Sequence, residues 1–147
     1  MKIKEVMNST VETIEPDATL RVAAQKMKEL DVGSLPVCEG DKIIGMVTDR
    51  DIVVRSTADG AEPNRAHVRE VMTPEVVCCT PEQDVKAAAQ LMEEKKVRRI
   101  PVVDGQQHPV GILSLGDVAA RSHNTRLAGE VLSQVAAHPR IQAKGRH

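Results

Sequence analysis

A hydroxyl and a carboxylate stand three positions apart at two places in the sequence. Thr48 and Asp51 lie in "GMVTDRD", and Ser114 and Asp117 lie in "GILSLGD". A hydroxyl can donate a hydrogen bond to a phosphate oxygen, and a carboxylate can accept both hydrogens of a ribose 2′,3′-diol. Each pair follows a short apolar run, at the expected junction of a strand and a helix, where unpaired backbone N–H groups attract anions. The spacing therefore suits a nucleoside phosphate.

The same residues also fit a structural role. Ser/Thr-x-x-Asp ahead of a helix is a capping-box pattern, in which the hydroxyl accepts from an early backbone N–H and the acid reaches back to the cap. On these residues alone both interpretations stay open, and their recurrence favours a shared binding role. Gly45 and Gly111 precede the two hydroxyls by three residues. We expect them to let the backbone approach a ligand closely.

The recurrence is part of a long internal repeat. Residues 4–40 align with residues 69–105 at an offset of 65, and 14 of these 37 positions are identical. One extra residue in the second copy then shifts the offset to 66, which pairs Asp51 with Asp117. A repeat of this length indicates two copies of one supersecondary unit, each of which needs a neighbour to bury its apolar face.

Each copy is predicted to run strand, helix, strand, strand, helix. Asp17 or Thr19 can cap the first helix, and Asp84 can cap its counterpart. The residues at helical spacing are Leu20, Ala23, Ala24, Met27 and Leu30 in the first copy and Val85, Ala88, Ala89 and Met92 in the second. Residues 34–48 and 99–114 predict hairpins that turn at Gly40 and Gly105, with apolar runs covered on both faces.

The predicted fold class is therefore α/β (α+β), with copies at 1–60 and 61–124 and a linker within 56–66. A further helix over 125–138 is expected to pack back on the core or against another subunit. Its apolar residues at helical spacing are Leu127, Val131, Leu132 and Val135. The tail at 139–147 is expected to be frayed.

Composition excludes several classes of function. The formal charge of −1 provides no basic field for a nucleic-acid backbone, and the absence of Phe, Tyr and Trp removes the platforms on which bases stack. No apolar run is long enough for a membrane span or resembles a secretory signal, so a cytoplasmic location is expected. Cys38, Cys78 and Cys79 are interpreted as small apolar residues, with a redox role as the alternative. The five histidines lie at no ligand spacing, so no metal site is predicted.

Residues 1–121 resemble a tandem pair of cystathionine β-synthase (CBS) domains, also called a Bateman module. The resemblance rests on the "EVM" starts of the copies, the "LPV" and "IPV" segments and the two motifs quoted above, and it is closest to small stand-alone bacterial CBS-pair proteins. It implies that the copies pack through their sheets about a pseudo-two-fold axis and leave two clefts. It also implies a disc-like homodimer and binding of AMP, ADP, ATP or a related adenosyl compound.

The resemblance implies specific residues for each cleft. One cleft would use Met46, Thr48, Arg50 and Asp51 with Val77, Arg98 and Arg99. The other would use Ile112, Ser114 and Asp117 with Glu12, Gly33 and Ser34. The three arginines of the first cleft suit phosphates, whereas Glu12 would repel them in the second. We therefore expect the first cleft to prefer phosphorylated adenosine, and the second to bind weakly, to bind a less charged adenosine compound or to stay empty. Arg98 and Arg99 could instead form a solvated strand end.

The leading functional hypothesis is a non-catalytic sensor that needs no cofactor and regulates an unidentified protein. The alternative is a structural, dimerising module that binds no nucleotide and uses both motifs only as helix caps. An enzyme is not supported, because no histidine or cysteine stands at a catalytic spacing beside the acids.

Overall fold

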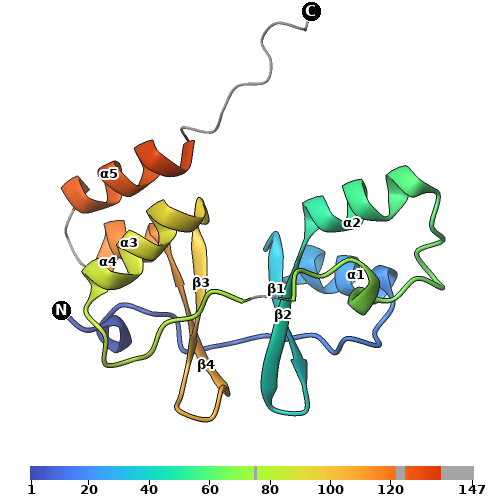
Figure 1. Ribbon diagram of the computed structural model, residues 1–147, viewed down its shortest axis with the longest axis horizontal. Coiled ribbons are helices and arrows are strands. Elements are labelled where there is room, and N and C mark those ends of the chain that lie inside the picture. Colours follow the sequence, from blue (N-terminus) through green and yellow to red (C-terminus); the bar gives the residue numbers. More distant parts are fainter. Residues whose placement is uncertain (75, 122–124, 137–147) are drawn as a thin grey trace, which may run out of the picture. The chain divides into compact units, whose positions relative to one another are not determined.

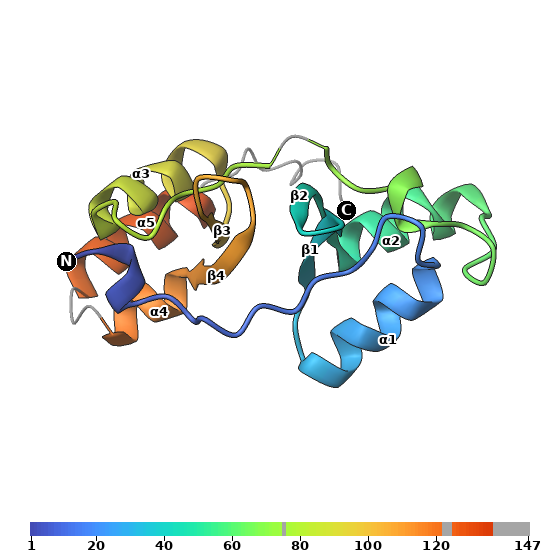
Figure 2. The ribbon, with the colours of Figure 1, turned by 90° about the horizontal axis from the view of Figure 1, so that it is seen from below.

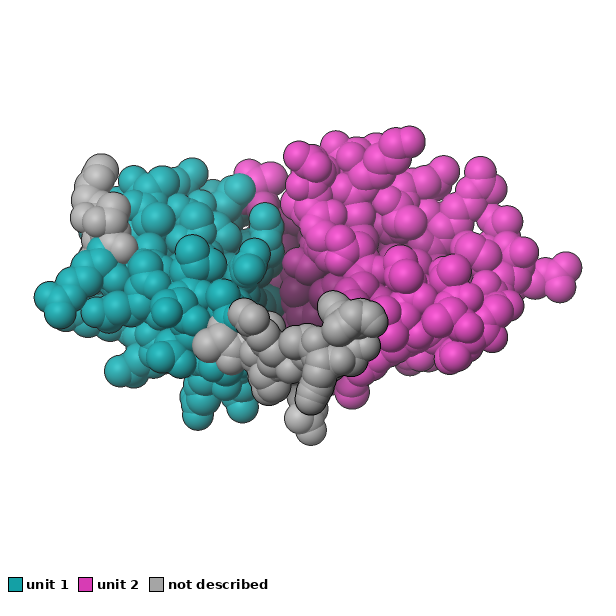
Figure 3. Space-filling model, turned by 90° about the horizontal axis from the view of Figure 1, so that it is seen from above, with its two compact units in different colours: residues 1–9, 77–103, 110–147 teal, residues 10–76, 104–109 magenta. Residues whose placement is uncertain are grey.

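The structural units of the chain do not coincide with its sequence copies. The computed structural model describes residues 1–74, 76–121 and 125–136. Unit 1 contains residues 1–9, 77–103 and those from 110 onward, and unit 2 contains residues 10–76 and 104–109 (Figure 3). Each unit therefore combines the start of one copy with the helices and hairpin strands of the other, and the turn of the second hairpin, residues 104–109, is grouped with unit 2.

In unit 2, helix α1 (Leu20–Leu30) begins at Thr19, whose side chain accepts a hydrogen bond from the backbone N–H of Val22. Thr19 rather than Asp17 is thus the cap. Leu20, Ala23 and Met27 are buried. Ala24 and Leu30 are exposed, so the buried face of α1 is narrower than predicted.

Strands β1 (Ser34–Glu39) and β2 (Lys42–Thr48) form the predicted antiparallel hairpin. Gly40 has φ = 63°, the left-handed conformation that this turn requires. Four consecutive residues of β1 are buried, whereas burial alternates along β2. In this hairpin both faces are therefore covered along β1 but not along β2. The short helix α2 (Asp49–Arg55) follows β2, and 3₁₀ turns η2 (Thr57–Asp59) and η3 (Val68–Glu70) complete the regular structure of the unit.

Unit 1 repeats this arrangement around helix α3 (Val85–Lys95) and the hairpin of β3 (Arg99–Val103) and β4 (Pro109–Ser114). Asp84 caps α3 as predicted by accepting from the Lys86 N–H. At the turn of the hairpin it is Gln107, with φ = 67°, that adopts the left-handed conformation, rather than Gly105. The 3₁₀ turn η1 (Ile3–Glu5) precedes these elements, and helices α4 (Leu115–Arg121) and α5 (Thr125–Ala136) follow them.

The first strand predicted in each copy is reduced to a single parallel bridge. Ile14 pairs with Val37 in unit 2, and Cys79 pairs with Val102 in unit 1. Each bridge consists of two backbone hydrogen bonds on the outer edge of the first hairpin strand. The chain passes from one unit to the other after residues 9 and 76. The bridges hold the residues that come soon after these two points against the hairpin.

Helix α5 packs on α3 and α4 inside unit 1 (Figure 1; Figure 2). Its buried residues Ala128, Val131 and Val135 join the hydrophobic cluster that contains Met92 and Val118. The prediction that this helix packs back on the core is confirmed, although Leu132 is exposed. Residues 137–138 of the predicted helix and the predicted tail lie outside the described residues. Among the described helices, none is long and apolar enough to cross a membrane.

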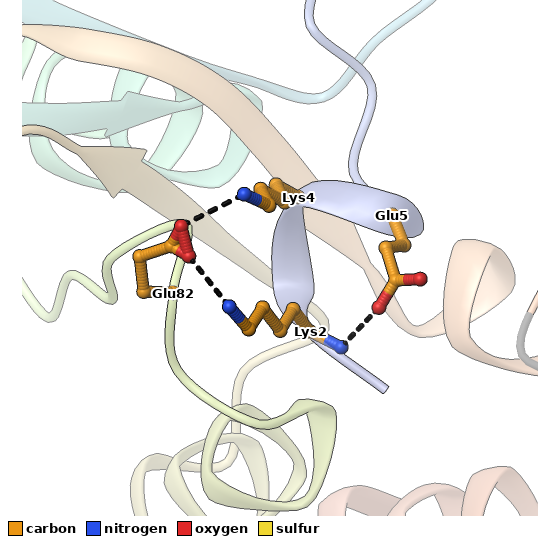
Figure 4. Close-up of polar contacts among 4 residues, drawn as sticks. All are labelled: Lys2, Lys4, Glu5 and Glu82. Carbon is orange, nitrogen blue, oxygen red and sulfur yellow. Dashed lines mark hydrogen bonds and ion pairs between the residues drawn. The ribbon is translucent and has the colours of Figure 1, made fainter.

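The start of the chain is held in unit 1 by burial and by ion pairs. Ile3 and Val6 are fully buried, and the Ile3 N–H donates to the Gln83 carbonyl at 2.9 Å. At the surface, the ammonium groups of Lys2 and Lys4 lie 3.1 and 2.8 Å from the Glu82 carboxylate (Figure 4). Hydrogen bonds from these lysines lower the pKa of Glu82. Exposed ion pairs stabilise little, so the buried apolar side chains contribute most of the attachment.

Candidate functional site

Both hydroxyl–carboxylate pairs form helix caps. The Thr48 hydroxyl accepts from the Asp51 N–H at 3.0 Å, and the Asp51 carboxylate accepts from the Thr48 N–H at 3.0 Å. Ser114 and Asp117 repeat these two hydrogen bonds at 3.0 and 3.1 Å. The capping interpretation is therefore confirmed in both units.

Capping leaves hydrogen-bonding capacity on each pair. The Thr48 hydroxyl uses a lone pair in the cap and retains its proton for donation. The cap occupies Oδ2 of Asp51, and Oδ1 lies 3.8 Å from Nε of Arg55. The Asp51 side chain is 14% exposed, and a carboxylate offers about four acceptor positions. The arrangement can cap a helix and still hold a polar ligand.

The glycine before each pair is packed against the protein's own chain. A Cβ on Gly45 would lie 2.9 Å from both the Met72 sulfur and the Thr73 carbonyl oxygen. Met46 and Thr73 exchange two backbone hydrogen bonds beside it. The expectation that Gly45 admits a ligand is therefore wrong, because the start of the second copy occupies that space.

Gly111 has the same environment in unit 1. A Cβ there would lie 2.5 Å from the Met7 sulfur and 3.1 Å from the Asn8 carbonyl oxygen, and Ile112 forms the matching bridge with Asn8. The same correction applies to Gly111. In each unit the start of the other sequence copy, which contains Met72 in unit 2 and Met7 in unit 1, is called the exchanged start. The glycine allows this segment to approach the second hairpin strand.

The segment before each hairpin proline lies beside the motif of its own copy. Ser34 pairs with Thr48 in the strand register, and the Asp49 N–H donates to the Gly33 carbonyl at 2.9 Å. In unit 1, the Leu115 N–H donates to the Arg98 carbonyl at 2.9 Å. Each predicted cleft combines residues of both units, so these groupings stay predictions.

The remaining predicted residues differ in exposure. Val77 is partly buried. Arg50, Arg98 and Arg99 are exposed, and no carboxylate in the described part of the chain pairs with them. Glu12 is an exposed acid whose carboxylate lies 3.5 Å from the Lys26 ammonium. This neighbour weakens the repulsion that was expected between Glu12 and an anion.

Two arginines beside the motifs were missed at the sequence level. Arg55 donates to the Val71 carbonyl at 3.2 Å, and Arg121 donates to the Val6 and Met7 carbonyls at 3.3 and 3.1 Å. The signal was present, because Arg55 and Arg121 occupy matching positions of the repeat at the offset of 66.

Two of the three cysteines are buried inside the protein. Cys38 and Cys79 are buried, and Cys78 is partly buried. Among the residues that the structure describes, no three His, Cys, Asp or Glu side chains lie together as a metal site. Burial raises the pKa of the Cys38 thiol, and it raises that of Cys79 to about 12. Both thiols therefore resist forming the reactive thiolate.

The buried Cys79 thiol is expected to make stability fall at alkaline pH. The unfolded chain loses this proton near pH 9 and the folded chain near pH 12, so the folded state binds more protons between these values. The stabilising contribution is complete below pH 9 and is lost as the pH rises toward 12. Urea unfolding at pH 8 and pH 10.5 measures it, with Cys79→Val as the comparison. Equal losses in wild type and variant would contradict this prediction.

The chain matches one protein-family model at two places. The model described as the CBS domain matches residues 3–56 and 68–124. The chain belongs to the CBS-domain family. The two matched segments correspond to the two sequence copies, and the resemblance to a CBS pair is confirmed. The fold class of two small α/β CBS repeats is confirmed as well.

Proteins of similar length align with most of this chain. The CBS domain-containing protein YhcV of Bacillus subtilis is 40% identical over 133 residues, which cover 90% of this chain and 94% of YhcV. A crystal structure of Hypoxic Response Protein I with two coordinated zinc ions has a TM-score of 0.75 at 36% identity and covers 81% of this chain and 97% of that chain. The structure of CBSX2 in complex with AMP has a TM-score of 0.72 at 24% identity, and the match covers 85% of this chain and 98% of that chain. This match shows that the two proteins have a similar fold.

Proposed function

We propose that this CBS pair is a non-catalytic regulatory module that binds an adenosine ligand, AMP, ADP, ATP or a related adenosyl compound, with no required cofactor. The observation that carries the proposal is the repeated capped pair, which keeps a hydroxyl proton and a carboxylate oxygen for a ligand in each unit. The common fold with an AMP-bound CBS protein supports it. A regulated partner would respond to the difference in ligand affinity between two conformations.

The capped pairs are the proposed contacts for the ribose and the first phosphate. Asp51 and Asp117 accept hydrogen bonds from the ribose hydroxyls, and the hydroxyls of Thr48 and Ser114 donate to phosphate oxygen. The proposed apolar contacts to the base are Met46, Val77 and Ile112. Aliphatic side chains must supply this surface, since the sequence has no aromatic residue.

The proposed phosphate contacts are the exposed arginines. Arg50, Arg98 and Arg99 have no acidic partner among the described residues, and guanidinium groups bind phosphate through paired, charge-assisted hydrogen bonds. We assign them to the ligand of the Asp51 motif. The Asp117 motif, assigned with Glu12, Gly33 and Ser34, is proposed to take a less charged adenosine compound or to bind weakly.

Thermal unfolding with a panel of ligands tests the function. AMP, ATP and S-adenosylmethionine are compared with GMP at millimolar concentration. A ligand at 100 times its dissociation constant adds about 2.7 kcal/mol of stability, so at least one adenosine compound should raise the melting temperature more than GMP does. No shift with any of them would favour the alternative, a structural module without nucleotide. The complete caps of both motifs are the observation in favour of that alternative.

We further propose that the module is a homodimer. In unit 1, α5 covers the helical face, and Ala89 is only 1% exposed. In unit 2, the repeat counterpart Ala24 is exposed, as are Val53 and Val54 on α2, at 59% and 47%. Helices α1 and α2 contact each other, and exposed apolar patches typically mark an interaction site.

Size-exclusion chromatography with static light scattering measures the molar mass of the protein and so tests the dimer. We expect wild type to elute at twice the 16.0 kDa mass of the chain, and Val53→Glu to shift the equilibrium toward the monomer by placing a charge in the contact. Gln106→Glu, at an exposed turn, is the matched control. A monomeric wild type would contradict the proposal.

A further inference from the structure

The last residue of each motif helix fastens that helix to the exchanged chain start. Arg55 at the end of α2 donates from Nη1 to the Val71 carbonyl at 3.2 Å. Arg121 at the end of α4 donates from Nη1 to the carbonyls of Val6 and Met7. Val6 and Val71 are themselves repeat counterparts at the offset of 65. The same contact is thus made twice, once in each unit.

Repetition within the helices singles out these arginines. Helix α2 reads "DRDIVVR" and helix α4 reads "LGDVAAR", and only two of the seven positions are identical. One is the motif carboxylate, Asp51 or Asp117, and the other is the arginine four residues later. The helices have diverged elsewhere while both kept an acid and a base one turn apart.

The fastened segments lead directly to the places where the chain leaves each unit. The first segment of unit 2 ends at residue 76, five residues after Val71, and the first segment of unit 1 ends at residue 9, two residues after Met7. Val71 and Val6 are buried, at 3% and 0% exposure. Each arginine therefore links a motif helix to the anchored end of a connection between units.

The two arginines differ in their relation to the motif acid. Nε of Arg55 lies 3.8 Å from Oδ1 of Asp51, the oxygen that the cap leaves available. Arg121 makes two carbonyl hydrogen bonds instead, and within the described residues no ion pair joins it to Asp117. A ligand hydroxyl on Oδ1 would therefore compete with Arg55 in unit 2, whereas Arg121 has no such contact to lose.

We propose that Arg55 is a positioning residue that couples occupancy of Asp51 to the segment 71–73, and that Arg121 anchors the segment 6–8 without such coupling. This inference rests on the proposed function. A ribose hydroxyl that donates to Oδ1 reduces the attraction of Asp51 for Arg55. The guanidinium then turns more fully to the Val71 carbonyl and tightens the segment. Coupling is reciprocal, so fixing the segment also favours the ligand.

Hydrogen exchange of single backbone amides, measured by NMR, tests the anchoring first. The reporters are the N–H groups of Met72 and Thr73, which donate to Val68 and Met46, and that of Asn8, which donates to Ile112. Loss of one hydrogen bond should speed exchange by roughly 3- to 10-fold. We expect Arg55→Gln to accelerate Met72 and Thr73 alone, and Arg121→Gln to accelerate Asn8 alone. Unchanged exchange in Arg55→Gln would overturn the role of Arg55.

Addition of AMP tests the coupling. In wild type and in Arg121→Gln we expect AMP to slow exchange at Met72 and Thr73, and in Arg55→Gln we expect no change at these amides. Arg55→Lys keeps the charge without the planar fork, so it should restore only part of the response. Calorimetric titration of AMP with each variant establishes that ligand is bound.

The outcomes separate this inference from the proposed function. If neither AMP nor any other adenosine compound of the panel binds wild type, the proposed function and the coupling are both overturned, while the exchange rates without ligand still decide the anchoring. If AMP binds and slows Met72 and Thr73 equally in wild type and Arg55→Gln, the coupling alone is overturned.

Discussion

Replacing Gly45 with alanine is expected to destabilise the chain by about 1–3 kcal/mol, the usual cost of inserting a methyl group into a packed interior. The new Cβ would lie 2.9 Å from the Thr73 carbonyl oxygen, which is backbone that two hydrogen bonds to Met46 hold in place. The Met72 sulfur is equally close, but it belongs to a flexible side chain, so the Thr73 backbone sets most of the cost. The variant must therefore separate the second copy's start from β2 or distort the strand.

Thermal unfolding followed by circular dichroism measures this effect. A loss of 1 kcal/mol lowers the melting temperature of a domain of this size by roughly 2–4 °C. Gly105→Ala is the matched control, because a Cβ at Gly105 meets no atom within 4 Å. A Gly45→Ala variant as stable as Gly105→Ala would show that the exchanged start does not pack tightly on β2. Gly111→Ala is expected to repeat the loss in unit 1.

Asp51→Asn is expected to weaken AMP binding by roughly 10- to 100-fold, since hydrogen bonds to a charged group contribute about 1.5–3 kcal/mol. The asparagine oxygen can still accept from the Thr48 N–H, so the cap survives. The amide nitrogen that replaces the second oxygen is a donor and cannot accept from a ribose hydroxyl. Affinity should therefore fall while the melting temperature without ligand stays nearly constant.

Isothermal titration of AMP into wild type and variant checks this prediction. Thr19→Ala is the control for general loss of a cap, because Thr19 caps α1 in the same unit and is not part of a motif. It should lower stability by about 0.5–2 kcal/mol and leave AMP affinity unchanged. Undiminished binding by Asp51→Asn would remove Asp51 from the proposed contacts.

The local elements were predictable because local signals determine them. Thr19 and Asp84 cap helices within one turn of chain, and Gly40 occupies the left-handed position of its turn. The second hairpin does turn through Gly105 as predicted, but Gln107 rather than a glycine takes the left-handed position there. Periodicity also overestimated the buried face of α1, because the breadth of a buried face depends on what packs against it.

The exchange of chain starts was not predictable from the repeat. Sequence identity marks where each copy begins, but the choice between packing on the same copy and on the other copy depends on tertiary contacts. The glycine signal at Gly45 and Gly111 correctly indicated a close approach. It did not identify what approaches, because a ligand and a neighbouring backbone both require the absence of a Cβ.

The candidate site was predictable to the extent that it is local. Thr48 with Asp51 and Ser114 with Asp117 are close in sequence and make the expected reciprocal bonds. Arg55 and Arg121 were not predicted as contacts, because they donate to backbone carbonyls. Every residue type has a backbone carbonyl, so the sequence of the accepting segment does not indicate the contact.

A crystal structure of the chain grown with millimolar AMP tests the central claim most directly. We expect the nucleotide to lie with its ribose hydroxyls on the carboxylate of Asp51, of Asp117 or of both, and with a phosphate oxygen on the neighbouring hydroxyl. AMP bound elsewhere, or its absence from both motifs at that concentration, would contradict the claim that these capped pairs form a nucleoside site.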